Sequence, residues 1–418
     1  MSLRRRLLSV LHKRLLGCAL PLRLAFWDGE IFDFSAAPSV TVTLRTPQTA
    51  RDFLLGRFDR LGDAYVAGDI LVEGDAQEIL RIGIELAERV GKTRWLPQVV
   101  RALGFVSFRH SKAADARAIA HHYDVSDAFY RAFLDSRMIY SSAYFRRGDE
   151  DIDTAQEQKL AHICRKLRLR PGERLLDIGC GWGGLLQFAA RRYDIEAVGV
   201  TNSRAQFETA RTRMAAAGLD ARVEIRNEDY RDIAGRARFD RIVSVGMYEH
   251  VGAGNWPSYF ASIERLLKPG GLLVHHGIIT TDPDGKAQGP PGGEFIDRYV
   301  FPGGALANLP RLLTEMARVK LEPVDVEDLR PHYARTLALW SSRFESNRDA
   351  VIAAGGIERY RIWRIYLAGM GQAFERGWLS IAQVVAYKPT STGPAPRPWT
   401  RNHQYASDNL STLCARAD

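Results

Sequence analysis

Two features that are scarce in this chain narrow its class. Nowhere in the 418 residues do about 18 apolar residues follow one another without a charge, which is the length that a helix needs to cross a bilayer. The four cysteines lie far apart and form no CxxC pair: Cys18, Cys164, Cys180 and Cys414. The sequence therefore predicts no membrane-spanning helix, no disulfide framework and no metal site, and it fits a reducing cytoplasm.

Acidic residues are fewer than basic ones, with 49 Asp and Glu against 58 Lys and Arg, a formal net charge of +9 and a pI of about 9.4. This balance favours an anionic partner, either nucleic acid or a membrane surface, unless the excess of arginine is a general property of the proteome. Because the basic residues are dispersed and no recognition module is present, we expect no nucleic-acid partner.

The N-terminus carries a dense positive charge. Six basic residues precede the first acid, Asp28, and Lys13 and Arg14 interrupt an apolar stretch that would otherwise resemble a signal peptide. Two alternatives remain open, an interfacial helix on anionic lipid or a helix packed on its own domain. Five leucines share one face of this expected helix: Leu3, Leu7, Leu8, Leu11 and Leu15.

The pattern of residues divides the chain into three regions. Residues 1–110 are expected to form an N-terminal α+β domain with accessory, membrane-docking or dimerisation roles. From 111 to 388, strands and helices alternate as in a doubly wound α/β sheet. Proline, serine, threonine and glycine concentrate from Pro389 onward, which predicts a flexible tail over 389–418.

The expected elements follow from periodicity and from turn residues. In the first region they are a strand at 37–44, a turn-rich connection at 63–69 and helices at 79–90 and 95–106. In the second they are strands at 174–178, 196–200, 222–225, 240–245, 272–276 and 381–387, and helices at 183–193, 204–217 and 257–267. Lys268-Pro269-Gly270-Gly271 predicts a helix stop, and 279–335 is expected to be an insertion or lid.

The segment LLDIGCGWGG at 175–184 predicts a buried strand, a glycine turn and a helix. Its glycines let a ligand approach the backbone at the carboxyl end of the strand, and they also match the weaker dinucleotide pattern GxGxxG. A nicotinamide cofactor would need an acid after the next strand, where Thr201 and Asn202 stand instead. The segment therefore favours S-adenosylmethionine.

Acidic residues near this turn have expected roles. Asp177 would orient the turn or meet the ammonium group of the cofactor, and Asp229 or Tyr230 would meet the adenine. Glu249 follows a second buried strand in VSVGMYEH at 243–250, which would place a carboxylate beside the cofactor. Its alternatives are a cap for the helix near Pro257 or a pair with an arginine.

Six motifs follow one another in order: HHYDVS at 121–126, YSSAYF at 140–145, LLDIGCGWGG at 175–184, MYEHVG at 247–252, YVFPGG at 299–304 and HYARTL at 332–337. With these motifs, residues 115–388 resemble the cyclopropane-fatty-acyl-phospholipid synthases, and the long N-terminal region resembles the two-domain bacterial members. The resemblance implies a class I methyltransferase fold, a Rossmann-like doubly wound sheet, with an extra N-terminal α+β domain.

The resemblance also implies a set of site residues. Those that would hold S-adenosylmethionine are Tyr140, Ser141, Asp177, Gly179, Gly181, Gly183, Thr201 and Gln206. A bicarbonate ion would act as the base, with Glu249, His276, Tyr333 and the backbone of Ile278 as its ligands, and Ser142 stands where the family has a cysteine.

Two of these assignments have alternatives. His276 follows His275, and because adjacent strand residues face opposite sides, only one of them can face the site. We choose His276 because the motif aligns there. Tyr333 has a role in the hydrophobic core as its alternative.

The implied reaction is transfer of a methylene group from S-adenosylmethionine to the cis double bond of an unsaturated phospholipid acyl chain, at the inner face of the cell membrane. Ser142 leaves a methyl-branched or methylene product open. A small-molecule methyltransferase and a catalytically silent lipid-binding protein are further alternatives. Family members are often dimers, so a homodimer is one expected assembly.

Overall fold

The computed structural model of the protein describes residues 20–54, 57–91, 126–283, 293–300, 304–391 and 397–405. The expected helices at the N-terminus and at 95–106, and the motif residues 121–125 and 301–303, lie outside the described residues. The chain divides into two compact units. Unit 1 contains Met1–Leu134, Thr280–Gly304 and Tyr333–Ser380, and unit 2 contains Asp135–Ile279, Ala305–His332 and Ile381–Asp418.

Unit 1 contains a four-stranded sheet in the order β2-β1-β3-β4. Alternate residues of β1 are buried, and they pack with the helices into a common core around Leu22, Leu24 and Phe26. The strand expected at 37–44 is present as β3. The elements of this part are β1 (Leu22–Phe26), β2 (Ile31–Asp33), β3 (Val40–Leu44), β4 (Ile70–Glu73), α2 (Pro47–Leu54), α3 (Phe58–Ala67) and α4 (Ala76–Gly91).

The turn-rich connection expected at 63–69 is wrong, because α3 continues to Ala67. Tyr65 and Val66 are buried, so the apolar face of this helix packs on the sheet rather than ending in a loop. Gly68, with φ of 89°, ends the helix in the left-handed conformation. The sequence suggests Gly68 as one residue of a longer turn, but in the structure it terminates the helix.

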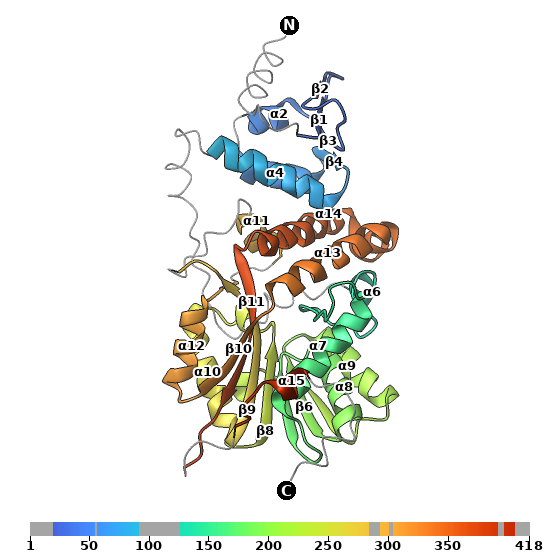
Figure 1. Ribbon diagram of the computed structural model, residues 1–418. Coiled ribbons are helices and arrows are strands. Elements are labelled where there is room, and N and C mark those ends of the chain that lie inside the picture. The colour runs from blue at the N-terminus through green and yellow to red at the C-terminus, as the bar shows by residue number, and fades with distance from the viewer. Residues whose placement is uncertain are drawn as a thin grey trace. The chain divides into compact units, whose positions relative to one another are not determined.

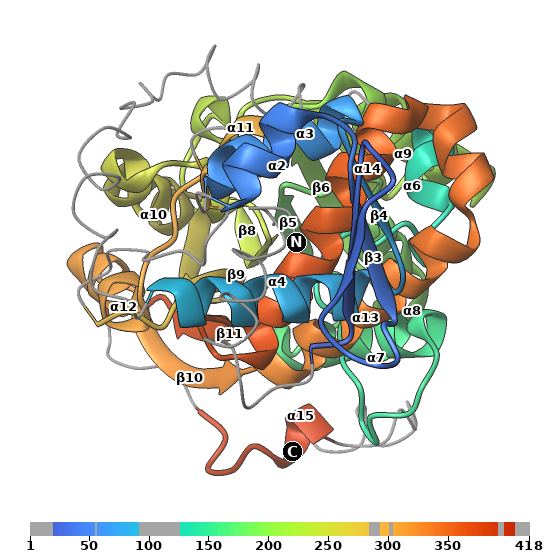
Figure 2. The same ribbon diagram turned by 90° about the horizontal axis from the view of Figure 1, so that it is seen from above.

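The other helices of unit 1 pack through aromatic side chains. Helix α4 lies against α14 (Figures 1 and 2). Phe129 packs edge-on against Trp363 with ring centroids 5.6 Å apart, and Tyr366 and Phe374 are also buried. These helices are α6 (Asp127–Arg131), α11 (Gly293–Tyr299), α13 (Arg330–Ser346) and α14 (Arg348–Glu375). No described helix combines the length and apolar character that crossing a membrane requires.

Unit 2 is built on a seven-stranded sheet in the order β10-β11-β9-β8-β5-β6-β7. The strand pairs from β9 to β7 are parallel, and β10 pairs antiparallel with β11. This mixed, mainly parallel sheet confirms the class I methyltransferase fold. The strands are β5 (Arg174–Ile178), β6 (Glu196–Thr201), β7 (Val223–Asn227), β8 (Phe239–Val245), β9 (Leu267–Thr280), β10 (Glu322–Asp328) and β11 (Leu379–Tyr387).

Helices cover both faces of this sheet (Figure 1). One hydrophobic cluster joins α7 (Ile152–Leu167), α8 (Gly184–Tyr193) and α9 (Arg204–Ala216) to the strands. The other joins α10 (Trp256–Leu266) and α12 (Leu309–Arg318) to the opposite face. Because both faces are covered, the central strands read as continuous apolar runs, which is why the sequence predicts them well.

Two expectations for unit 2 need correction. The strand expected at 272–276 starts at Leu267, because α10 ends at Leu266 and the chain extends at once. Gly270 lies inside this strand and donates its N–H to the carbonyl of Lys388 at 2.8 Å. The region 279–335, expected as an insertion or lid, also contains the edge strand β10, whose alternating charged residues disguise it.

Part of the segment expected to be a flexible tail forms α15 (Asn402–Tyr405) against α7. Gln404 is buried, and its carbonyl accepts a hydrogen bond of 2.8 Å from Nε of Arg165. Composition did not show this packing because the contacts come from a helix more than 200 residues earlier.

Two glycine substitutions should change stability in opposite directions. A Cβ at Gly199 in β6 would lie 2.5 Å from Cδ1 of Leu186, so Gly199→Ala should lower the free energy of unfolding by about 1–3 kcal/mol. Gly83 is exposed inside α4 with no atom near its missing Cβ, so Gly83→Ala should raise it by about 0.5–1 kcal/mol. Denaturant unfolding measures both, and equal stabilities for the two variants would contradict this packing.

Candidate active site

The glycine turn lies between the end of β5 at Ile178 and the start of α8 at Gly184. Gly179, Gly181 and Gly183 have φ of 85°, 54° and 77°, which residues with a Cβ rarely adopt. The N–H groups of Gly179 and Cys180 both donate to the carbonyl of Val200 at 3.0 Å. A Cβ at Gly181 would meet nothing within 4 Å, so a ligand has room to approach this part of the turn.

The loop after β8 comes close to the same turn. A Cβ at Gly179 would lie 2.8 Å from Cγ of Met247. In the sheet, Ile178 pairs with Ser244, whose hydroxyl donates to the carbonyl of Ile178 at 3.1 Å. The two segments that the sequence predicts to form the site therefore meet at the carboxyl ends of neighbouring parallel strands.

Asp177 is buried at the end of β5, with 3% of its surface exposed. Its Oδ1 has no hydrogen-bond partner among the described residues. Burial raises the pKa of Asp177 to about 7, although the charge of Lys159 acts in the opposite direction. A buried carboxyl group with an unused oxygen is suited to a cationic ligand, because the ligand would compensate its lost hydration.

The end of β6 holds the predicted residues Thr201 and Gln206 together. The hydroxyl of Thr201 donates to Oε1 of Gln206 at 2.8 Å, and the N–H of Ser203 donates to Oγ1 of Thr201 at 3.2 Å. Ser203 also caps α9, since its hydroxyl accepts the N–H of Gln206 at 3.3 Å. Both predicted side chains are therefore fixed beside the glycine turn.

Asp229 is already engaged within the protein. Its carboxylate pairs with Arg231 at 2.7 Å and accepts a hydrogen bond from Asn202 at 3.1 Å. Burial acts to raise the pKa of Asp229, but the bonds from Arg231 and Asn202 hold it below its usual value. Tyr230 is buried with its ring 5.5 Å from that of Tyr259. Contact of Asp229 or Tyr230 with adenine stays a prediction.

Helix α7 holds the segment that carries Tyr140, Ser141 and Ser142. Gln156 donates from Nε2 to the carbonyl of Ser141 at 2.9 Å, and Lys159 donates from Nζ to Oγ of the same serine at 2.9 Å. Ser142 has no exposed surface, and its hydroxyl donates to the carbonyl of Ala143 at 3.0 Å. The hydroxyl at the position of the family's cysteine is therefore bound within its own turn.

Glu249 follows β8 in the 3-10 helix η3 (Tyr248–His250). Its Oε1 accepts the N–H of Ile278 at 2.8 Å, and its buried Oε2 has no partner within the described part of the chain. Burial raises the pKa of Glu249 to about 7, while the Ile278 N–H lowers it. Glu249 is thus bound to β9 and does not cap α10, whose N-cap residue is Asn255.

The two adjacent histidines of β9 face opposite sides. His275 packs among aromatic rings, with its centroid 4.9 Å from that of Tyr248. His276 has Nδ1 3.0 Å from Nε2 of Gln383 on β11, and its buried Nε2 has no partner in the described ranges. Burial lowers the pKa of both imidazoles, so both are neutral near pH 7. Each ring thus has one buried nitrogen without a partner in the described ranges, Nδ1 of His275 and Nε2 of His276, and the choice of His276 for the site stays a prediction.

Tyr333 lies on α13 in unit 1, whereas every other predicted site residue lies in unit 2. It is buried, with its ring centroid 4.6 Å from that of Phe374 and 6.2 Å from that of Trp340. These contacts agree with the core alternative, and a role for Tyr333 at the site stays a prediction.

Three polar residues beside the site were not predicted from the sequence. Gln156 and Lys159 support Ser141, and Gln383 contacts His276. A signal existed for the first two, because they fall on the buried face of a helix together with Leu160 and Ile163. No signal in the sequence identifies Gln383, since a single glutamine in an apolar strand does not indicate which residue it contacts.

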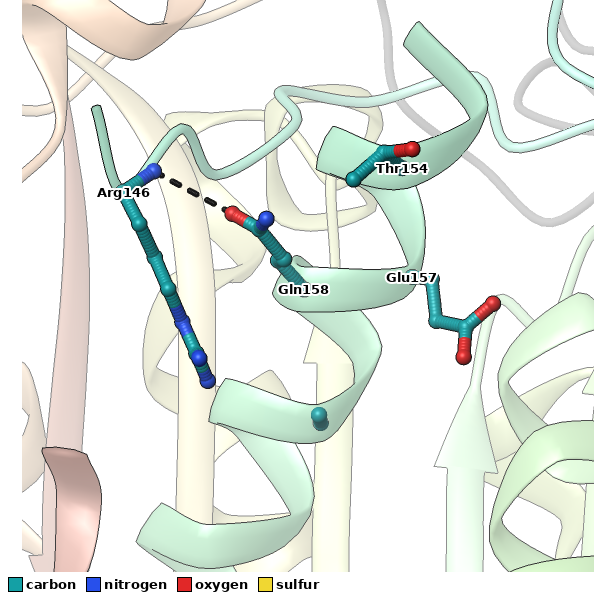
Figure 3. Close-up of a pocket in the computed structure, with 5 residues that line it drawn as sticks. Arg146, Thr154, Glu157 and Gln158 are labelled. Atoms are coloured by element: carbon teal, nitrogen blue, oxygen red, sulfur yellow. Dashed lines mark hydrogen bonds between the residues drawn. The ribbon is translucent and has the colours of Figure 1, made fainter. Parts of the chain in front are cut away.

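The structure also has an open hollow of about 290 Å³ beside α7 (Figure 3). Its lining is polar, and the N–H of Arg146 donates to Oε1 of Gln158 at 3.1 Å across it. It contains none of the predicted site residues. The hollow is therefore separate from the chemistry at the strand ends. Its lining residues are Arg146, Thr154, Glu157, Gln158 and Ala161.

Comparison with known proteins agrees with this geometry. The family model for mycolic acid cyclopropane synthetase matches residues 110–384, and a model for a domain of unknown function matches residues 12–92. The chain belongs to the mycolic acid cyclopropane synthetase family. It is an S-adenosylmethionine-dependent methyltransferase.

Relatives of this family cover much of the chain. A "Probable fatty acid methyltransferase" of Pseudomonas putida is 44% identical over 96% of this chain and 100% of its own length. The cyclopropane-fatty-acyl-phospholipid synthase of Escherichia coli K12 is 38% identical over 65% of this chain and 68% of its own. The structure of mycolic acid cyclopropane synthase CmaA1 complexed with SAH and CTAB has a TM-score of 0.62 at 33% identity, covering 65% of this chain and 98% of that one.

Glu249 should make the stability of this family member depend on pH. Its pKa of about 7 in the folded protein lies above the ordinary value of 4.5, so the unfolded chain ionises first and stability falls as the pH rises through this range. Glu249→Gln removes this loss of stability, because glutamine does not ionise. Between pH 4.5 and 8 the variant should gain about 2–3 kcal/mol relative to the parent protein in denaturant unfolding.

Glu208→Gln is the matched control, because the Glu208 side chain is 54% exposed on α9. The control should lack the gain in stability that the burial of Glu249 produces. A Glu249→Gln curve that runs parallel to the parent curve would contradict a buried, protonatable Glu249.

Proposed function

We propose that this enzyme transfers a methylene group from S-adenosylmethionine to the cis double bond of an unsaturated phospholipid acyl chain. One observation carries the proposal. Glu249 and His276 each have a buried polar atom without a partner in the described residues. Glu249 follows β8, the neighbour of the strand that leads into the glycine turn, and His276 lies on β9, the next strand in the sheet. The names of the relatives, cyclopropane synthases and a fatty acid methyltransferase, support a lipid substrate.

The chemistry explains why such a site is buried. A carbon–carbon double bond is a poor nucleophile, so it must be held close to and in line with the sulfonium methyl group. Methyl transfer leaves a carbocation, and water would capture it unless the site is dry. A base must then remove a proton from the new methyl group so that the ring closes.

Bicarbonate fits the polar groups at this site. Near pH 7 Glu249 is partly protonated and can donate from its carboxyl group, and the neutral imidazole of His276 can donate from Nε2. Glu249, His276 and the N–H of Ile278 would hold the ion, which would supply the base. The Ile278 N–H is shared, because it donates to Oε1 of Glu249 at 2.8 Å.

A second candidate function is C-methylation of the acyl chain to a methyl-branched or methylene product. Ser142 favours it, since its hydroxyl is bound to the carbonyl of Ala143 at 3.0 Å and does not replace a cysteine beside the base. With the base held differently, loss of a proton from a neighbouring chain carbon would give a methyl-branched alkene. A hydride shift to the cationic carbon, followed by loss of a proton from the new methyl group, would give the methylene product, and neither route forms a ring.

We also propose that the enzyme works as a peripheral protein on the inner face of the cell membrane. The net charge of +9 and the six basic residues before Asp28 support attraction to anionic lipid. The acyl chain of a phospholipid is reached only from a membrane surface, so this location suits the proposed substrate.

Mass spectrometry of acyl esters tests the function. After incubation of the protein with adenosylmethionine and cis-unsaturated phospholipid vesicles, we expect products heavier by one CH2 with fragmentation typical of a ring. A branched or methylene product would support the second candidate. Unchanged lipid, with methylation of a soluble acceptor instead, would overturn both.

Glu249→Gln should lower turnover in this assay at least ~100-fold, because general acid–base groups contribute about that much, while adenosylmethionine binding stays within ~2-fold. Titration calorimetry measures the binding. An equal loss of cofactor affinity and turnover would show that Glu249 belongs to the cofactor site instead.

Removal of residues 1–16 should weaken sedimentation with anionic vesicles at low salt, since five of the six basic residues before Asp28 are lost. The melting temperature should change little. Neutral vesicles are the control, and unchanged binding to anionic vesicles would eliminate residues 1–16 as the membrane contact.

A further inference from the structure

Lys159 is a buried lysine next to the cofactor turn. Only 2% of its surface is exposed, and its Nζ donates to Oγ of Ser141 at 2.9 Å. One helical turn earlier, Gln156 donates to the backbone carbonyl of the same serine at 2.9 Å. Two adjacent positions on one face of α7 thus fix the side chain and the backbone of a residue expected to bind the cofactor.

A hydrogen bond to a serine does not by itself account for burying an ammonium group, which costs several kcal/mol without a negative partner. Two carboxyl groups act on this charge, those of Asp135 and Asp177. Asp135 acts more strongly on Lys159, and each of its oxygens accepts one backbone N–H, from Arg137 at 2.9 Å and from Ile139 at 2.7 Å. Asp177 is the group with an unused oxygen, Oδ1, within the described residues.

The cofactor brings its own positive charge to this arrangement. Adenosylmethionine carries a sulfonium and an ammonium group, and it would be repelled by Lys159 if Asp177 did not balance the lysine. Conversely, a buried Asp177 without Lys159 would take up a proton and lose its attraction for the cofactor. The two charges therefore balance each other, and this balance matters most when a cation binds beside them.

We propose that Lys159 is a positioning residue for adenosylmethionine: its ammonium group holds Ser141 and balances the charge of Asp177, so that the site accepts a cationic ligand. The inference rests on the proposed placement of the cofactor at Ser141 and Asp177. Lys159 itself need not touch the cofactor.

The pH range in which this pair acts follows from the groups around it. The pKa of Asp177 is raised by burial to about 7 and that of Lys159 is lowered by burial to about 8. The other titratable groups that interact with the pair are Asp135, Cys180, Tyr259 and His276. Burial keeps the thiol and phenol protonated and the imidazole neutral near pH 7, so the pair dominates titration there.

The chain provides a matched control on the same helix. Lys166 lies two turns after Lys159, is 1% exposed, and has its Nζ 2.5 Å from Oε2 of Glu327. Burial lowers its pKa as well, but Coulombic attraction comes from Glu327 and Asp325 rather than from Asp177. Lys166→Met therefore reproduces the loss of a buried lysine without changing the charge at the cofactor turn.

The test is titration calorimetry with adenosylmethionine from pH 6 to 9 on the full chain. For Lys159→Met we expect affinity near pH 7.5 to fall by about 10-fold or more, because Asp177 becomes protonated. The difference from the parent should shrink toward pH 9, where Asp177 ionises again and Lys159 of the parent loses its proton. Lys166→Met should keep the parent pH profile.

A second comparison covers the case in which Lys159→Met fails to fold. Asp177→Asn should weaken binding strongly, and adding Lys159→Met should cause a much smaller loss than it causes in the parent protein, because only the contact with Ser141 is then lost and the unbalanced lysine is removed as well. Removing both charges is also better tolerated than removing one. Additive losses, or a pH-independent loss in Lys159→Met, would overturn the inference. A parent protein that does not bind adenosylmethionine would instead overturn the proposed function.

Discussion

The arrangement of the site depends on two carboxyl groups, Asp177 and Glu249, that are buried after neighbouring parallel strands with one oxygen each left without a partner in the described residues. Burial raises the pKa of each to about 7. Groups held in this way cost stability, and a ligand that binds them recovers part of this cost. The charge of Lys159 acts on Asp177, which lies directly before the cofactor turn, whereas Glu249 is bound to the backbone of β9. The two carboxyls therefore suit different tasks, attraction of a cation and handling of a proton.

The sheet brings these groups together through its register. Ile178 pairs with Ser244 and Val245 pairs with His276, so the ends of β5, β8 and β9 lie at one edge. The lack of a side chain at Gly179 is also important, because it leaves room for Met247 between the loops that follow β5 and β8. Helix α7 completes the site from one face of the sheet with Gln156 and Lys159. An apolar core on both faces holds this edge rigid.

Most strands of the central sheet, the glycine turn and the positions of Asp177 and Glu249 at strand ends could be predicted from the sequence, because buried parallel strands are apolar runs and polar residues at their ends are distinct. The pairings of side chains could not. Lys159 contacts Ser141 and Gln383 contacts His276 across long stretches of chain, and nothing in the local pattern shows such partners. Strand β10 does not stand out in the sequence because an edge strand keeps charged residues. The end of α3 resembles a turn because Gly68 directly follows the helix.

The charge of Asp177 is tested most directly by counting protons. Titration calorimetry of the parent protein with adenosylmethionine at about pH 6.5, in buffers of different ionisation enthalpy, gives the number of protons exchanged on binding. A carboxyl with a pKa of about 7 that meets a cation must ionise, so binding should release a large fraction of one proton, and the release should fade above pH 8 and in Asp177→Asn. Tight binding without any proton release would contradict a protonatable Asp177 in the cofactor site.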